Sequence, residues 1–284
     1  MERTIPVQKQ SKLVTQKTKE KIRVQYTSVV ERSNGVGKRI VRKRASLMKL
    51  GYSDEDLALV PAGVIEHSFP CGNPIAFADI RRGDTVIDVG SGAGLDCIIM
   101  ARRLGVENRI LGFDLTPAMV ASARRNAAAA GTPRVHFGVG DAEALPMPDC
   151  VADVVVSHGA FYLATDKNKA LKEAFRVLQP GGRLCVTDLI HTGLRAIPQL
   201  GFRLSGATVI ESAEEYMALV TSTGFRRVVL RSQQFFGIED AASLWGVSPL
   251  IGLLARLGCH WVFRGTANRL VRGFSSIHLT AVKP

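Results

Sequence analysis

The sequence has few cysteines and no long apolar run. Its five cysteines are widely spaced and include no Cys-x-x-Cys pair, so neither a zinc site nor a disulfide framework is indicated, and we expect no metal cofactor. No stretch approaches the roughly 18 uncharged apolar residues that a membrane-spanning helix needs. We therefore expect a cytoplasmic protein without a transmembrane segment. At 284 residues, 46% of them hydrophobic, the chain is long enough for a full α/β core with additional segments.

Outside its first 50 residues the chain carries almost no excess charge. Residues 1–50 contain 14 Lys and Arg against 3 Asp and Glu, a net charge of +11 out of the total of +12. Affinity for a polyanion scales with the phosphates that are neutralised, so any contact with RNA or an anionic membrane would run through this arm. We interpret the arm as a solvated helical extension and expect no nucleic-acid partner. Peripheral contact with a membrane stays open.

The N-terminal part of the chain is predicted to be helical after a short tail. Residues 1–17 lack apolar periodicity and are interpreted as a basic mobile tail. Residues 18–79 are expected to form a helical cover, with two helical pieces interrupted at Ser33-Asn34-Gly35. Ser53, followed by three acidic residues, is a typical N-cap and predicts a further helix.

Residues 80–284 are expected to form one catalytic domain. From Asp84 onward, short β-branched runs alternate with helical segments, a pattern typical of a parallel sheet covered on both faces. The predicted fold class is α/β: a Rossmann-like, doubly wound, seven-stranded sheet with the N-terminal helical cover and a helical insertion, residues 238–272, before the last strand. The predicted strands are 85–89, 109–113, 134–139, 153–157, 183–188, 227–235 and 274–282.

A glycine-rich turn follows the first predicted strand. It reads Asp88-Val-Gly-Ser-Gly-Ala-Gly94 and leads into a helix. Glycines let such a turn fold tightly and leave bare backbone against a ligand, while the helix N-terminus offers unpaired N–H groups. The dinucleotide fingerprint would need Gly or Ala at position 95, where this chain has Leu. The turn therefore favours a nucleoside cofactor over a dinucleotide.

Two carboxylates stand where a nucleoside needs them. Asp114 ends the second strand and is positioned to accept hydrogen bonds from both ribose hydroxyls. Asp141 lies just past the third strand, where it would accept from the adenine amino group. The predicted cofactor-binding residues are Asp88, Gly90, Ser91, Gly92, Gly94, Asp114, Leu115, Asp141, Ala142 and Ser157.

With these motifs, residues 80–190 resemble the class I methyltransferases, and the resemblance implies S-adenosylmethionine as cofactor. A narrower similarity, to the arsenite methyltransferase family, covers most of residues 50–284. It is carried by segments such as Leu50-Gly-Tyr-Ser-Asp-Glu-Asp-Leu57 and Cys71-Gly-Asn-Pro74. That family holds trivalent arsenic with several cysteines, and only Cys71 matches one of them. The others align with Gly159 and near Arg203, and a single thiol cannot form a multidentate soft-metal site.

The candidate acceptor site lies after the fourth and fifth strands and under the N-terminal cover. His158 is the predicted general base, since an imidazole titrates near neutral pH. Asp188 and His191 are a candidate orienting pair, and Tyr162 is expected to line the pocket or donate a hydrogen bond. The predicted substrate-pocket residues are Tyr52, Cys71, Phe161, Arg203 and Trp245.

These observations predict a methyltransferase that acts on a small, partly apolar organic acceptor of the specialised-metabolite type, as a monomer or homodimer. The insertion 238–272 is interpreted as amphipathic helices that close an apolar acceptor pocket, with a membrane or dimer contact as the alternative. Three other functions stay open: methylation of arsenite or a thiol, methylation of RNA through the basic arm, and non-catalytic binding of S-adenosylmethionine.

Overall fold

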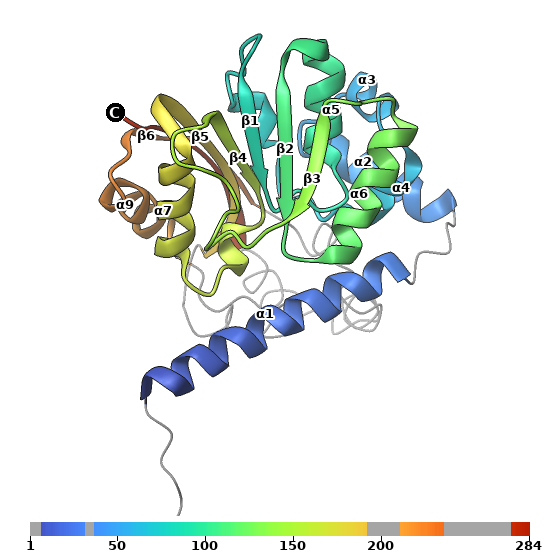
Figure 1. Cartoon of the computed structure of the whole chain (residues 1–284). Helices are drawn as coiled ribbons and strands as arrows, with labels where there is room; N and C mark the ends of the chain where they lie inside the picture. Colours follow the sequence, from blue (N-terminus) through green and yellow to red (C-terminus); the bar gives the residue numbers. More distant parts are fainter. Residues whose placement is uncertain (1–6, 32–36, 192–210, 236–273) are drawn as a thin grey trace, which may run out of the picture.

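The computed structural model of the chain describes residues 7–31, 37–191, 211–235 and 274–284. This part contains one seven-stranded sheet with helices on both faces (Figure 1). The strands are β1 Thr85–Val89, β2 Arg109–Asp114, β3 Val135–Val139, β4 Ala152–His158, β5 Leu178–His191, β6 Arg226–Phe235 and β7 Phe274–Val282. The helices are α1 Val7–Glu31, α2 Gly37–Lys49, α3 Asp54–Ala58, α4 Ala62–His67, α5 Leu95–Leu104, α6 Pro117–Ala129, α7 Lys167–Val177 and α9 Ala213–Ser222, with 3-10 turns η1 Pro74–Phe77, η2 Gly105–Glu107 and η3 Phe161–Leu163.

The strand order is β3-β2-β1-β4-β5-β7-β6. β1 to β5 pair in parallel, whereas β7 is antiparallel to both β5 and β6. The predicted fold class, with its seven-stranded sheet, is therefore confirmed. The chain order reverses between β1 and β4, and in open α/β sheets the crevice at the carboxyl ends of such strands is where ligands bind.

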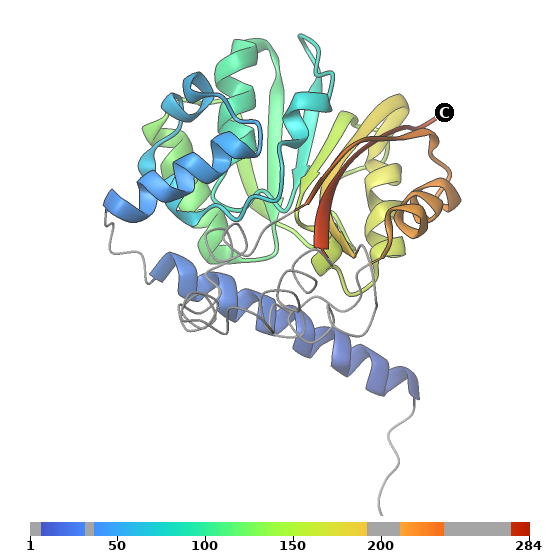
Figure 2. The ribbon, with the colours of Figure 1, turned by 180° about the vertical axis from the view of Figure 1, so that it is seen from behind.

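Alternating side chains of the central strands enter two separate cores. Val86 and Val154 pack with α5, α6 and the N-terminal cover, while Ile87 and Val155 pack with α7 and α9 on the opposite face. This alternation, with both faces buried, is the reason that these strands read as nearly continuous apolar runs in the sequence. Figure 2 shows the same layers from behind.

The N-terminal cover is part of the main core. Leu47, Leu57 and Val64, from α2, α3 and α4, are buried in the same cluster as α5 and α6. The predicted cap at Ser53 is present as a full capping box, because Ser53 accepts from the Asp56 amide and the Asp56 side chain accepts from the Ser53 amide.

The predicted boundary of the tail at residue 17 requires correction, because it falls inside α1, which runs from Val7 to Glu31. Only Ile22 is a buried apolar side chain of this helix from residue 15 onward, so apolar periodicity was too weak to reveal it. The helix packs against α6, a contact between segments that are far apart in the sequence. Residues 1–6 and the predicted insertion 238–272 lie outside the described residues. Within the described ranges no helix is long and apolar enough to cross a membrane.

Candidate active site

The glycine-rich turn is fixed against β2 by its backbone. The amides of Gly90 and Ser91 both donate to the carbonyl of Phe113, at 2.7 and 3.0 Å. Gly90 has a φ of 81°, and a Cβ on it would lie 2.3 Å from the Cβ of Ala160. Glycine is therefore required at this position, both for the backbone conformation and for the close approach of the loop after β4. Gly94 is the N-cap of α5, so the helix N-terminus directly follows the turn.

The carboxylate of Asp114 is held between the turn and α6. Its Oδ2 accepts from the Gly92 amide at 2.9 Å, and its Oδ1 accepts from the Thr116 amide at 2.8 Å. Burial raises the pKa of this carboxyl, whereas the hydrogen bonds from Thr116 and Gly92 act in the opposite direction. The side chain still reaches the pocket lining, as a ribose-binding carboxylate would.

Asp141 lies at one end of the pocket beside a lysine from α1. Lys19 Nζ donates to Asp141 Oδ2 at 2.6 Å and to Glu143 Oε2 at 2.8 Å. The other oxygen of Glu143 accepts from the Thr165 hydroxyl at 2.6 Å and from two backbone amides. Sequence reasoning missed Lys19, because it is 122 residues from Asp141 and belongs to the charged arm that was assigned to solvent.

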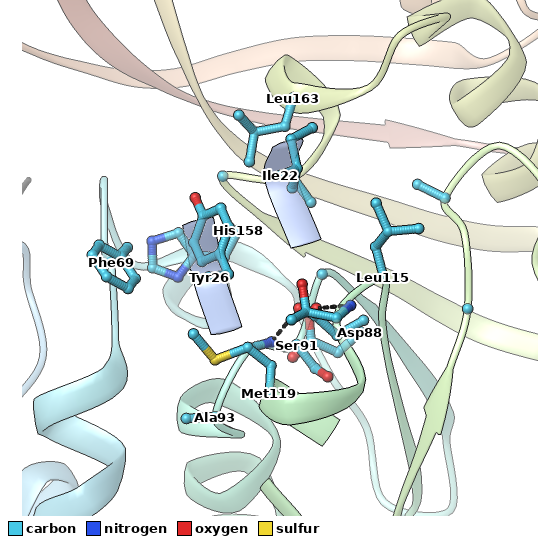
Figure 3. A pocket seen from close by; sticks show the side chains of 18 of the residues that line it. Ile22, Tyr26, Phe69, Asp88, Ser91, Ala93, Leu115, Met119, His158 and Leu163 are labelled. Carbon is cyan, nitrogen blue, oxygen red and sulfur yellow. Dashed lines mark hydrogen bonds between the residues drawn. The ribbon is translucent and has the colours of Figure 1, made fainter. Parts of the chain in front are cut away.

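These groups surround one pocket at the carboxyl ends of the parallel strands (Figure 3). Two of its buried polar atoms, Asp88 Oδ1 and Ser91 Oγ, have no hydrogen-bond partner within the described part of the chain. Burial and the neighbouring Asp96 carboxylate raise the pKa of Asp88. Eight predicted cofactor residues line the pocket: Asp88, Gly90, Ser91, Gly92, Asp114, Leu115, Asp141 and Ala142. Ser157 does not; its hydroxyl donates to the carbonyl of Val89 beneath the turn.

His158 does line the pocket, but both of its ring nitrogens are engaged. Nε2 accepts from the amides of Cys71 and Gly72, at 2.9 and 3.3 Å. That leaves the proton on Nδ1, which lies 2.8 Å from Asp96 Oδ2. The other Asp96 oxygen accepts from the Tyr52 hydroxyl at 2.5 Å. Because both ring nitrogens are engaged within the protein in this arrangement, the predicted role of His158 as general base stays a prediction.

The other predicted catalytic residues are not brought together at the pocket. Asp188 is fully buried away from the lining and accepts from the Tyr216 hydroxyl of α9 at 2.6 Å. Burial raises its pKa to about 7, opposed by that hydrogen bond. Tyr162 is buried behind the lining with its hydroxyl bonded to Tyr26. The side chain of His191 lies outside the described residues, so the proposed pair with Asp188 stays a prediction.

The predicted substrate-pocket residues mostly support the pocket from behind. Tyr52 and Cys71 are buried, and Phe161 belongs to the core on the α7 face, so none of the three reaches the lining. Arg203 and Trp245 lie outside the described residues. The apolar lining instead includes four large side chains that sequence reasoning did not single out: Ile22, Tyr26, Phe69 and Leu163. No local pattern marks them, since they come from three separate segments of the chain.

The fold and the pocket define a Rossmann-like protein that binds a nucleoside cofactor at the switch point of its sheet. Comparison with known proteins identifies the family. The sequence profile of the methyltransferase domain matches residues 80–235. The chain belongs to the methyltransferase domain family, as its motifs predicted.

The chain aligns with only part of the length of each of its curated relatives. The chain is 40% identical over 144 residues to an arsenite methyltransferase of Halobacterium salinarum, a match that covers 51% of this chain and 37% of that protein. It is 31% identical over 156 residues to the ubiquinone/menaquinone biosynthesis C-methyltransferase UbiE of a Marinomonas species, covering 52% of this chain and 62% of that one. The crystal structure of CrArsM, an arsenic(III) S-adenosylmethionine methyltransferase from Chlamydomonas reinhardtii, shares the fold, with a TM-score of 0.54 and 24% identity over 85% of this chain and 72% of that one.

Replacing Asp114 by Asn should weaken cofactor binding while keeping one of the two backbone hydrogen bonds that fasten the turn, because the side-chain NH2 cannot accept from the second amide. The amide loses the negative charge that would accept from the ribose hydroxyls, so we expect a loss of about 2–4 kcal/mol, or roughly 30- to 1,000-fold in affinity. Calorimetric titration with S-adenosylhomocysteine measures this. The matched control is Asp149→Asn, a carboxylate whose side chain is 73% exposed. Equal affinities of the two folded variants would remove Asp114 from the site.

Variants of His158 separate a supporting role from a role as base. His158→Ala should lower the thermal midpoint by several degrees, since it strands the Asp96 carboxylate and two amides at about 1–3 kcal/mol each. His158→Gln retains an acceptor for the amides. This variant should therefore regain most of the thermal midpoint and should bind S-adenosylhomocysteine as the wild type does. If both variants instead fold as stably as the wild type while turnover falls 10²-fold or more and the pH profile flattens, His158 is the base.

Proposed function

We propose that this protein transfers the methyl group of S-adenosylmethionine to a small, partly apolar organic acceptor. The observation that carries the proposal is the composition of the pocket. The pocket combines the carboxylates of Asp114 and Asp141 with apolar and aromatic side chains, among them Ile22, Tyr26, Phe69 and Leu163. A polar nucleoside and an apolar acceptor are the two ligands that such a lining suits.

The described residues fit the cofactor group by group. Asp114 would accept from the ribose hydroxyls, and Asp141 from the adenine amino group. The unpartnered Asp88 Oδ1 suits the cationic amino group of the methionine part, and the unpartnered Ser91 hydroxyl suits its carboxylate. When bound, the cofactor supplies a sulfonium methyl group that is transferred by in-line displacement. The protein's main contribution would then be alignment of the acceptor and exclusion of water.

Two aromatic side chains of the pocket lining, Tyr26 and Phe69, pack against each other. The rings of Tyr26 and Phe69 meet edge to face, with centroids 5.4 Å apart and planes at 85°. The Tyr26 hydroxyl is bonded to Tyr162, and burial together with the nearby Asp114 raises its pKa to about 12. It is therefore protonated at neutral pH and suits a donor or packing role toward an uncharged acceptor.

Methylation of arsenite is the second candidate, and the 40% identical relative favours it. The local chemistry of Cys71 argues against it. Its thiol is 1% exposed and donates to the Thr187 carbonyl at 3.6 Å, and burial, with the Asp188 and Asp96 carboxylates, raises its pKa well above the ordinary range. A soft metalloid needs several thiolates. Among the residues that the structure describes, no three His, Cys, Asp or Glu side chains are grouped to hold a metal ion.

RNA methylation through the basic arm is less favoured by the placement of α1. Lys19 and Ile22 of that arm line the pocket, and the Lys19 charge is neutralised there by Asp141 and Glu143. A flipped base would need an open pocket mouth. Screening the purified protein with labelled S-adenosylmethionine against phenols, thiols, lipophilic metabolites, arsenite and RNA tests the proposal; transfer to RNA or arsenite alone would refute it.

A pair of cysteine variants tests the arsenite alternative. We expect no arsenite methylation by the wild type. We also expect unchanged transfer to organic acceptors by Cys71→Ser, because the thiol is buried and donates a hydrogen bond to the Thr187 carbonyl. A Cβ on Gly159 would lie 3.4 Å from Cys71 Sγ, so Gly159→Cys should create a dithiol that binds trivalent arsenic, at some cost in stability because φ is 66° there. Tight arsenic binding, measured by thiol titration, should appear only in that variant. Arsenite methylation by the wild type that Cys71→Ser abolishes would restore the arsenite function.

A further inference from the structure

One face of α1 forms the roof of the cofactor pocket. Lys19, Ile22 and Tyr26 all line the pocket, and their spacing of three and four residues places them on the same side of the helix. Lys19 contacts Asp141 and Tyr26 lies near Asp114. The helix therefore passes over both carboxylates that are expected to bind the nucleoside. In Figures 1 and 2, α1 runs along the edge of the sheet where the parallel strands end, which is the lower edge in these views.

The roof is attached mainly by polar contacts. Arg23 Nε donates to the Leu115 carbonyl at 3.3 Å, and Tyr26 is bonded to Tyr162. Ile22 is the one aliphatic side chain that α1 buries from residue 15 onward, the Tyr26 ring packs against Phe69, and Val24 is 61% exposed. Elements with little buried apolar surface open at low free-energy cost, so α1 can separate from the body without unfolding the sheet.

Lys19 makes the strongest of these attachments. Its ammonium bridges Asp141 and Glu143, and Glu143 is itself anchored through Thr165 on the far side of the pocket. The Lys19 side chain is 16% exposed, so salt and water weaken this bridge less than they weaken a surface pair. Although burial opposes it, the pKa of Lys19 is raised by the two carboxylates, so the bridge is charged at neutral pH.

We propose that Lys19 is a positioning residue that latches α1 over the bound cofactor and orients Asp141 for the adenine amino group. Asp141 Oδ2 has two lone pairs, so it can accept from Lys19 and from adenine together, while Oδ1 accepts from the Glu143 amide at 3.0 Å. The cofactor then enters and leaves only when the Lys19 bridge is broken. This inference rests on the proposed cofactor site but not on the identity of the acceptor.

The test is the exchange of radiolabelled S-adenosylhomocysteine on the full chain, followed by rapid filtration. Lys19→Gln removes the bridge and should raise the association and dissociation rate constants by about tenfold, because opening no longer requires an ion pair to break. Raising the salt concentration should accelerate exchange in the wild type but not in this variant. Lys17→Gln and Lys21→Gln, exposed on the same helix, are matched controls and should exchange as the wild type does.

Hydrogen exchange of the α1 amides supplies an independent readout. S-adenosylhomocysteine should protect residues 15–31 in the wild type and in Lys19→Arg, and protect them less in Lys19→Gln. Unchanged rates and unchanged protection in Lys19→Gln would overturn the latch while leaving the cofactor site intact. Failure of the wild type to bind S-adenosylhomocysteine at all would overturn the proposed function, and the latch with it.

Discussion

The imidazole of His158 joins segments that are remote in the sequence, and the pocket depends on that junction. It lies at the end of β4, next to the glycine-rich turn, with Asp96 of α5 on one nitrogen and the amides of Cys71 and Gly72 on the other. A neutral ring with its proton on Nδ1 is the form that satisfies all of these partners. The ring thereby connects the N-terminal cover to β4 and α5 and holds this wall of the pocket in place.

A second histidine supports the same wall. His278 of β7 accepts from the Asn73 amide at 2.9 Å, next to the two amides that His158 holds. Burial and the neighbouring His158 lower the pKa of His278 to about 4, so it is neutral at physiological pH, as an acceptor must be. Gly72 has no room for a side chain, since a Cβ would lie 2.5 Å from both His278 Nε2 and Thr187 Cγ2. Backbone packed against these two side chains explains why this position requires a glycine.

The chain shares the fold of an arsenite methyltransferase but lacks cysteines at Gly159 and near Arg203, where the resemblance places them. The pocket keeps its glycine-rich turn and both carboxylates, but at position 159 it has a glycine with a φ of 66° where the resemblance places a cysteine. Cys71, which does match, is enclosed by Tyr162, Leu189 and Leu50 and bonded to a carbonyl. A thiol in such surroundings behaves as a small apolar residue. Apolar residues on α1 and around Phe69 are consistent with an organic acceptor in its place.

The sequence by itself determined the strands, the cap at Ser53, and the places of the glycine-rich turn, Asp114 and Asp141. Each of these depends on neighbours within a few residues or on a fixed place at a strand end. Only the tertiary structure decided what His158 does and that Lys19 enters the pocket. Lys19 meets Asp141 across 122 positions and His158 meets Cys71 across 87, and such pairs leave no periodic pattern in either segment. A side chain's chemistry shows which roles it is capable of, but which of its atoms are already bonded depends on chain segments that only folding brings together.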